Sequence, residues 1–347
     1  MISAAAIWAA ETGLLSDSAL RTGIRCACAN RLQKVREEFE RDPEAAWSRM
    51  IAALDAAPIA ESTELANEQH YELPPEFFKA VLGPRRKYSG CEWAPGDDLA
   101  GAEDRALATI CERGQLEDGQ RILELGCGWG SLSLFMAERY PAARIVGVSN
   151  SAPQRKSILE AAKCRGLDNL EVVTADINLF APQGRFDRIV TIEMLEHVRN
   201  YRELFARFHD WLEDDGRLFV HVFRHLKFPY FFETKGAGNW MGRHFFTGGV
   251  MPSHDLFDRV QDSLVIEESW KVDGRHYEQT ANAWLDQLDA RDSEVLPILS
   301  RHYGPTEAHR WLQRWRIFFM ACAEMFGFEE GSQWGVSHYR FRRQVRL

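Results

Sequence analysis

"RILELGCGWG" at residues 121–130 decides the fold, because a hydrophobic run ends in three glycines spaced two apart. The run predicts a buried strand, and a helix is expected after it at 130–140. Glycine permits a tight turn and a close ligand approach, since no Cβ intervenes. The N–H groups of a helix that starts at such a turn favour a polar or anionic ligand group. Glu124, two residues before the first glycine, could accept a hydrogen bond from an ammonium group of that ligand.

Strands and helices alternate downstream of this turn. Five strands are predicted in this region, at 121–126, 143–150, 170–176, 186–193 and 216–223. Helices are predicted between them, at 130–140, 151–166 and 199–213. This alternation predicts a parallel, doubly wound sheet. Two later segments, 263–274 and 335–345, predict further strands, and a helical segment at 277–327 precedes the last of them.

The part of the chain before the sheet has a different character. Residues 1–66 show helical periodicity, residues 66–93 predict loops with a short helix, and a further helix is expected at 104–117. We therefore expect two parts, a helical cap with a cofactor-covering segment at 1–103 and a catalytic domain at 104–347. The helical segment at 277–327 would be a lid on the second part. The N-terminal helices could pair two chains in a homodimer or cap a single chain.

The glycine pattern differs from that of a dinucleotide-binding fold. The GxGxxG spacing fails because residue 131 is serine. A ribose-binding acid is expected about 20 residues further on, yet Ser149, Asn150 and Gln154 stand in that region. Asp176, at the end of the third predicted strand, is well placed to bind an adenine amino group, or it serves as a turn residue. The pattern therefore weakens a nicotinamide interpretation.

Composition excludes several classes of protein. The 347 residues are 45% hydrophobic and carry a net charge of −9, which disfavours nucleic acid or an anionic membrane as the main partner. Seven scattered cysteines without paired spacing predict reduced thiols, with no disulfide frame and no metal site. The sequence contains no membrane-spanning stretch and no convincing signal peptide. We expect a cytoplasmic protein without stable membrane association.

"IEMLEHVRNY" follows the fourth predicted strand and supplies the candidate catalytic groups. Glu193, Glu196 and His197 stand at i, i+3 and i+4, so they share one face if the segment turns helically. Two acids and an imidazole can attract a protonated amine and remove its proton, which frees the nitrogen lone pair for attack. The alternative is a solvated helix start, where acidic residues are favoured by the helix dipole.

With these pieces in place, the sequence resembles the S-adenosylmethionine-dependent methyltransferases of the cyclopropane fatty acid synthase superfamily. Within it, the chain looks closest to the plant coclaurine and related benzylisoquinoline N-methyltransferases. The stretches that carry the resemblance include "YELPPEFFKAVLG", "KYSGCEW", "LELGCGWGSLSL", "VGVSNSAPQ", "IEMLEHVRNY", "FFTGGVMPS", "WRIFFMACAEMFG" and "GSQWGVSHYRF". The resemblance implies a Rossmann-like class I methyltransferase fold, S-adenosylmethionine as cofactor, S-adenosylhomocysteine as product, and methyl transfer to the nitrogen of a small cyclic or aromatic amine.

The resemblance also implies roles for individual residues. His197 would be the base, Glu196 its partner at the substrate nitrogen, and Glu193 a positioning residue. The implied cofactor-binding residues are Tyr88, Ser89, Glu124, Gly126, Gly128, Gly130, Ser149, Asn150, Gln154, Asp176 and Ile177. The expected substrate-binding residues are Trp93, His221, Tyr277, Phe326, Trp334 and Tyr339.

Three alternatives remain open from the sequence. The first is a cyclopropane fatty acid synthase, which transfers a methylene group to unsaturated phospholipid acyl chains. In those relatives a "YSC" motif contacts a bound bicarbonate through the cysteine backbone, whereas here Gly90 takes the third position and Cys91 follows. His221, Glu196 and Tyr277 match the remaining bicarbonate ligands. The others are a non-catalytic cofactor-binding protein and a methyltransferase for another heteroatom, such as a phenol oxygen.

Overall fold

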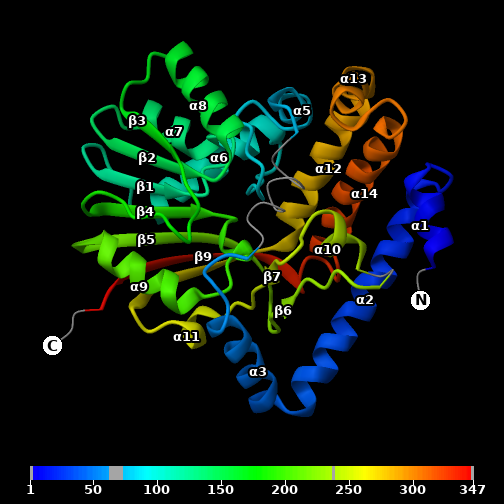
Figure 1. Ribbon diagram of the computed structural model, residues 1–347, viewed down its shortest axis with the longest axis horizontal. Coiled ribbons are helices and arrows are strands. Elements are labelled where there is room, and N and C mark those ends of the chain that lie inside the picture. Colours follow the sequence, from blue (N-terminus) through cyan, green and yellow to red (C-terminus); the bar gives the residue numbers. More distant parts are fainter. Residues whose placement is uncertain (1–2, 62–72, 237–238, 345–347) are drawn as a thin grey trace.

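The computed structural model describes residues 3–61, 73–236 and 239–344. Its centre is a seven-stranded sheet in the order β3-β2-β1-β4-β5-β9-β8 (Figure 1). The strands are β1 (Arg121–Leu125), β2 (Arg144–Ser149), β3 (Leu170–Thr174), β4 (Phe186–Ile192), β5 (Leu212–His225), β8 (Leu264–Val272) and β9 (Trp334–Arg343). β1 to β5 pair in parallel, and β9 runs antiparallel to β5 and β8. The predicted doubly wound, mostly parallel sheet of seven strands is therefore confirmed.

Helices cover both faces of the sheet, which explains why its parallel strands are continuous apolar runs. One face carries α6 (Leu99–Arg113), α7 (Ser131–Arg139) and α8 (Ala152–Cys164) (Figure 1). The other carries α3 (Pro43–Asp55), α9 (Tyr201–Trp211) and α11 (Phe257–Val260). Because side chains alternate along a strand, Ile122 packs into the first core and Leu123 into the second.

The strand order reverses beside β1, and this reversal positions the site. β1 pairs with β2 on one side and with β4 on the other. Ligands of open α/β sheets bind at the carboxyl ends of the strands at such a point. Leu125 pairs with Thr191, so the glycine turn after β1 lies beside the segment that follows β4.

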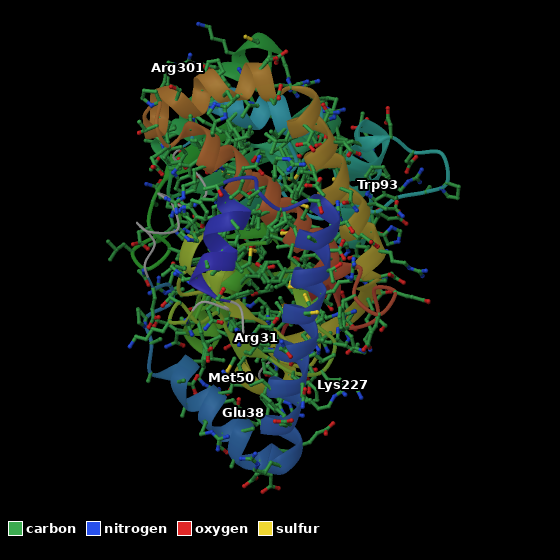
Figure 2. The ribbon with its side chains drawn as sticks, turned by 90° about the vertical axis from the view of Figure 1, so that its right-hand side faces the viewer. Arg31, Glu38, Met50, Trp93, Lys227 and Arg301 are labelled. Atoms are coloured by element: carbon green, nitrogen blue, oxygen red, sulfur yellow. The ribbon has the colours of Figure 1, made fainter. Side chains whose placement is uncertain are left out.

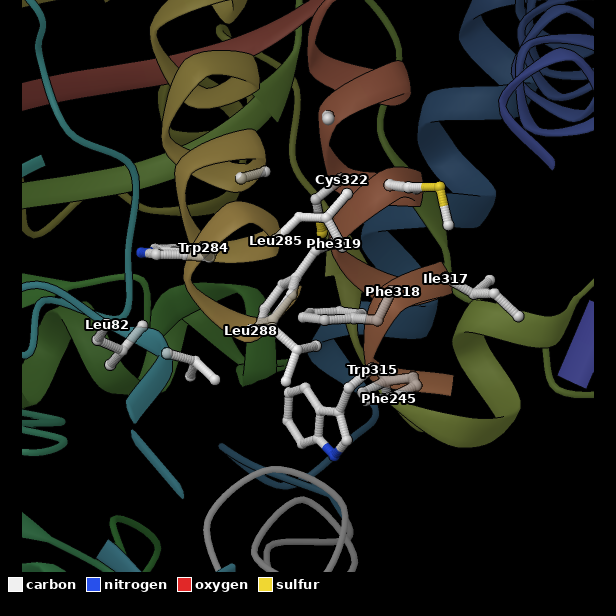
Figure 3. Packing of buried hydrophobic residues seen from close by; sticks show 14 of the residues in the cluster. Leu82, Phe245, Trp284, Leu285, Leu288, Trp315, Ile317, Phe318, Phe319 and Cys322 are labelled. Atoms are coloured by element: carbon white, nitrogen blue, oxygen red, sulfur yellow. The ribbon is translucent and has the colours of Figure 1, made fainter. Parts of the chain in front are cut away.

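Three helices stand between β8 and β9, where the lid was predicted at 277–327. They are α12 (Gly274–Ala290), α13 (Asp292–Tyr303) and α14 (Ala308–Phe326). Their apolar faces form one core with α5 (Pro75–Val81) and α10 (Trp240–His244) (Figure 3). Trp315 lies at the centre of this core, with ring centroids 4.7 Å from Phe77 and 5.1 Å from Phe245. The same core therefore holds the lid against the segment that precedes Tyr88.

The N-terminal helices α1 (Ala4–Glu11) and α2 (Asp17–Arg41) lie against the lid (Figure 2). Glu11 is buried and accepts hydrogen bonds from Arg310 and Arg314 of α14 and from Trp240 of α10. Burial alone would raise the pKa of Glu11, but these donors, Arg314 first, lower it to about 2. These contacts hold the N-terminal arm against α10 and α14.

The remaining differences from prediction concern short elements and boundaries. The elements β6 (Tyr230–Phe231), β7 (Val250–Met251), α10 and α11 were not predicted, because runs of two to five residues carry no measurable periodicity. α6 begins at Leu99 rather than at residue 104, so it crosses the predicted division at residue 103. Residues 62–66 of the predicted helical arm lie outside the described residues. No helix in the described ranges is long and apolar enough to cross a membrane.

Candidate active site

The glycine turn after β1 adopts the conformation that its sequence predicts. Gly126, Gly128 and Gly130 have φ angles of 76°, 51° and 80°, in the left-handed region that favours glycine. A Cβ atom on Gly126 would lie 2.8 Å from Met194. A Cβ atom on Gly130 would lie 2.6 Å from Ile158 of α8. Gly130 is the N-cap of α7 and serves helix packing, whereas Gly126 and Gly128 line cavities.

Two hollows flank the glycine turn, and we call them together the cofactor cavity. They share three lining residues, Gly126, Gly128 and Glu193. Of the predicted cofactor residues, the hollow toward β2 and β3 is also lined by Ser149, Asn150, Gln154 and Ile177. The hollow toward α6 is also lined by Tyr88, Ser89 and Glu124. The structure thus brings together all the predicted cofactor residues except Gly130 and Asp176.

Asp176 differs from its predicted place at the cavity wall. Its neighbours Ala175 and Ile177 line the cofactor cavity, but Asp176 does not. One of its carboxylate oxygens accepts hydrogen bonds from the backbone and the side-chain nitrogen of Asn178, at 2.8 and 2.9 Å. Asn178 in turn exchanges two hydrogen bonds with the backbone of Ala60. These hydrogen bonds place Asp176 in a turn, the second role that the sequence left open, and its adenine-binding role stays a prediction.

Gln154 provides a test of whether a cofactor fits this cavity. Its side-chain oxygen accepts a hydrogen bond of 2.6 Å from the Ser149 hydroxyl. Its side-chain nitrogen is buried and has no hydrogen-bond partner among the described residues. Buried polar atoms are nearly always hydrogen-bonded, so this donor fits a bound ligand that offers an acceptor, as a ribose does.

Glu124 is the one carboxylate of β1 and is fully buried beside the glycine turn. The Ser133 hydroxyl donates a short hydrogen bond to it. Burial raises its pKa to about 8, and the Ser133 bond opposes that shift. With a pKa of about 8, Glu124 is mostly protonated at neutral pH.

Two buried charged residues, Glu103 and Lys87, stabilise the loop that carries Tyr88 and Ser89. The carboxylate of Glu103, on α6, accepts hydrogen bonds from the backbone nitrogens of Arg85 and Lys87. Lys87 is itself buried, and its ammonium donates to the Ser89 hydroxyl at 2.7 Å and to the Gly90 carbonyl at 2.5 Å. These contacts direct the Gly90 N–H toward the site. Sequence analysis did not identify Lys87, because one lysine in a loop has no distinguishing pattern.

Glu193 lies at the junction of all these features. Its φ of 46° turns the chain sharply after β4, and the helical turn that follows covers only Leu195–His197. The three predicted catalytic groups therefore do not share one helical face. One oxygen of Glu193 accepts from Gly90 N–H at 2.9 Å and contacts His221 Nε2 at 3.1 Å, and the other accepts from the Tyr277 hydroxyl at 2.7 Å.

Glu196 makes its contact elsewhere, at the backbone of β5. It is fully buried, accepts a hydrogen bond of 2.7 Å from the backbone nitrogen of Phe223, and lines neither the cofactor cavity nor the acceptor cavity described below. Burial, followed by the negative charge of Glu193, raises the pKa of Glu196 well above its ordinary value. Burial also raises the pKa of Glu193, but three donors surround that carboxylate. When the pair holds one proton, Glu196 carries it and Glu193 is the anion.

His197 lies between the cofactor cavity and a third hollow, which we call the acceptor cavity. Its ring stacks on Phe246 with a centroid distance of 5.3 Å. Burial lowers its pKa to about 4, while the charge of Glu193 acts in the opposite direction. The imidazole is therefore neutral at physiological pH.

The acceptor cavity is lined mainly by aromatic and sulfur-containing side chains. Two of the predicted substrate residues, Tyr277 and Phe326, line it and stack on each other at 4.0 Å. Glu193 and His197 provide its polar wall. A larger apolar cavity of about 410 Å³ lies next to it, beneath α1 and α2. The two cavities share Phe232, Met241 and Met325 as a common wall.

Four predicted substrate residues do not line the acceptor cavity. Trp93 lies at the edge of the molecule beside a surface hollow and donates from its indole to Thr280 (Figure 2). Tyr339 packs on the opposite face of β9, in the core with α9 and α11, because side chains alternate along a strand. Trp334 lines the larger apolar cavity instead, and His221 acts behind Glu193.

A doubly wound sheet with a glycine turn after β1 and an acidic residue at the end of the neighbouring strand is the fold of the class I methyltransferases. This is the class that the sequence predicts. The match to known proteins is more specific. The chain belongs to the mycolic acid cyclopropane synthetase family, whose model matches residues 60–333.

Relatives and solved structures agree with this assignment. The chain is 33% identical to (S)-coclaurine N-methyltransferase of Thalictrum flavum subsp. glaucum, over 96% of this chain and 94% of that one. It is 30% identical to the cyclopropane-fatty-acyl-phospholipid synthase of Escherichia coli strain K12, over 78% of this chain and 67% of that one. A crystal structure of coclaurine N-methyltransferase bound to N-methylheliamine and SAH superposes with a TM-score of 0.92 at 33% identity, covering 96% of this chain and 98% of that one.

Proposed function

We propose that this protein is an S-adenosylmethionine-dependent N-methyltransferase that acts on a small cyclic or aromatic amine. The observation that carries the proposal is the position of Glu193, a carboxylate that lines both parts of the cofactor cavity and the acceptor cavity. An anion at this junction attracts a protonated amine to the place where a methyl donor meets it. The similarity to coclaurine N-methyltransferases supports the same substrate class.

Each residue then has a role that follows from its position. When bound, S-adenosylmethionine supplies an electrophilic methyl group on a sulfonium. Gly126 and Gly128 let it approach the backbone, and the free donor of Gln154 binds its ribose. Glu193 holds the ammonium group of the acceptor, and the neutral imidazole of His197 accepts its proton. The aromatic walls exclude water and align the nitrogen with the methyl group, which lowers the barrier by positioning.

The donors around Glu193 argue for amine methylation over lipid cyclopropanation. By the sequence resemblance, the synthases hold bicarbonate with a "YSC" backbone contact and with a histidine, a glutamate and a tyrosine, which His221, Glu196 and Tyr277 match. Here Gly90 N–H, His221 and Tyr277 hold the carboxylate of Glu193 instead. We infer that a built-in carboxylate takes the place of an exchangeable anion. Methylene transfer to unsaturated phospholipid remains the second candidate, because the Escherichia coli synthase is 30% identical.

A substrate panel tests the proposal directly. The purified protein would receive S-adenosylmethionine with tetrahydroisoquinoline, the same amine bearing an apolar ring substituent, a matched phenol, or vesicles of unsaturated phospholipid. We expect methylation of both amines. Higher kcat/KM is expected for the substituted amine, because the aromatic and methionine walls of the acceptor cavity bury its apolar part. Methylene incorporation into the phospholipid without amine methylation would support the second candidate.

Replacing His197 tests the proposed base. His197→Ala is expected to slow amine methylation at saturating substrate by about 10²-fold or more, as for loss of acid–base catalysis. Binding of S-adenosylmethionine, measured by calorimetry, should be retained. His209→Ala on α9, whose imidazole contacts Asp210 near the surface, is the matched control. An unchanged methylation rate in His197→Ala would remove this residue from the mechanism.

Glu124 makes cofactor binding depend on pH. Because burial raises its pKa to about 8, binding of a hydrogen-bond donor against the ionised carboxylate must release a proton at neutral pH. Affinity for S-adenosylmethionine should therefore rise with pH up to about 8 and then level off. Glu124→Gln should lose this slope. Calorimetry in two buffers of different ionisation enthalpy measures the released proton, and equal release from both proteins would contradict the assignment.

We further propose that the protein acts in the cytoplasm and that residues 1–103 work as a cap that completes the cofactor site. All seven cysteines are free thiols, which supports a reducing compartment. The contacts of Glu11 with α14 support capping of the same chain more than pairing in a homodimer. Light scattering of the purified protein distinguishes a monomer from a homodimer.

A further inference from the structure

A chain of hydrogen bonds leads from Glu193 through the sheet toward the surface. His221 Nε2 contacts Glu193 at 3.1 Å, and His221 Nδ1 contacts His338 Nε2 at 2.9 Å. His338 Nδ1 lies 2.6 Å from a guanidinium nitrogen of Arg113, at the end of α6. The outer end of the chain is Glu92, which accepts from Arg113 at 2.9 and 3.3 Å. Both histidines are buried and come from adjacent strands, β5 and β9, in direct register.

The chemistry of arginine sets the direction of this chain. A guanidinium can only donate hydrogen bonds and stays charged in proteins. His338 must therefore accept at Nδ1 and, as a neutral ring, carry its proton on Nε2. That proton faces His221 Nδ1, which must accept in turn. His221 consequently carries its own proton on Nε2 and donates it to Glu193.

We propose that Arg113 is a remote positioning residue, which fixes the tautomers of His338 and His221 so that His221 always donates to the carboxylate of Glu193. The inference rests on the proposed function, in which Glu193 receives the ammonium group. Together, Gly90 N–H, the Tyr277 hydroxyl and His221 Nε2–H give the carboxylate of Glu193 three hydrogen-bond donors. Three donors stabilise the anion, so Glu193 stays charged and able to pair with the substrate ammonium.

The fixed direction also distinguishes between two possible functions of these hydrogen bonds, which are stabilisation of the Glu193 anion and export of a proton. Proton export from Glu193 would require His221 to accept at Nε2 and donate at Nδ1, the reverse of the arrangement that Arg113 imposes. The chain therefore holds the anion and does not carry protons outward. The proton of the acceptor must leave by another route, through His197 or with the departing product.

Nuclear magnetic resonance on the intact protein tests the assignment without any activity measurement. Selective ¹⁵N labelling of histidine, with His221→Gln and His338→Gln used to assign the two rings, reports which nitrogen of each ring is protonated. We expect Nε2–H on both rings in the wild type. In Arg113→Met, we expect signals of the other tautomer to appear. Wild-type rings that carry their protons on Nδ1 would overturn the proposal, whether or not the enzyme methylates amines.

Kinetics supply the second arm. Arg113→Met should lower kcat for the amine about tenfold, since one hydrogen bond to a charged group is at stake, while KM for S-adenosylmethionine is unchanged. Arg113→Lys, which keeps a cationic donor, should recover part of the rate. Arg105→Met is the matched control, because Arg105 is also on α6 but pairs with Asp97 at the surface. Equal losses in Arg113→Met and Arg105→Met would indicate a merely structural role and contradict the proposal.

Discussion

Glu193→Gln is expected to lower the rate of amine methylation by about 10²- to 10⁴-fold at saturating substrate, the range for loss of a charged catalytic group. The amide has the shape of the carboxylate but no negative charge. Its NH₂ group would also face at least one of the donors Gly90, His221 and Tyr277. Both effects remove the anion that attracts the protonated amine. The measurement is kcat for tetrahydroisoquinoline, with cofactor affinity determined in parallel.

Glu196→Gln is the matched control for this substitution. Glu196 belongs to the same motif but faces Phe223 and lines neither the cofactor nor the acceptor cavity. Because Glu196 holds a proton when Glu193 is the anion, a neutral amide in its place should have a much smaller effect on kcat. If Glu196→Gln were the more damaging of the two, the acid at the substrate nitrogen would be Glu196, as the sequence resemblance implies.

Trp315→Ala is expected to reduce the free energy of unfolding by about 3–5 kcal/mol, the usual cost of deleting a buried aromatic ring. Trp315 is fully buried between α5, α10 and α14, and its ring contacts Phe77, Phe245 and Phe318 (Figure 3). Denaturant unfolding, with the midpoint and slope compared to wild type, measures the loss. Because this core holds the lid against α5, we also expect a lower rate of methylation, even at temperatures at which the variant is still folded.

Trp311→Ala, one turn earlier on α14, is the control for that prediction. Trp311 is only partly buried and stacks on Tyr303 at 4.1 Å, so a loss of about 1 kcal/mol is expected. Equal destabilisation by the two substitutions would mean that the lid core does not depend on the packing around Trp315.

The cofactor side of the site was largely predictable from sequence. Glycines in the left-handed region and polar residues at strand ends lie in short, continuous motifs, and nine of the expected cofactor residues line the cavity. Gly130 and Asp176 do not line the cavity, because one packs against α8 and the other accepts hydrogen bonds in a turn, and both tasks use the same residue types. The acceptor side was harder. Of six expected residues only Tyr277 and Phe326 line it, since aromatic residues in the lid and in β9 serve the cores equally well.

By itself, the sequence determined the order of strands and helices, the parallel sheet, the glycine turn and the presence of two acids and a histidine after β4. These features depend on the periodicity of apolar residues and on the conformational freedom of glycine. Both are properties of residues that lie close together in the chain. Only the tertiary structure decided which acid faces the cavities. That choice depends on the left-handed backbone of Glu193 and on donors more than 25 residues away in the chain, at Gly90, His221 and Tyr277. The direction of the hydrogen bonds from Arg113 to Glu193 also depends on the tertiary structure, because no spacing within the sequence specifies contacts between α6, β5 and β9.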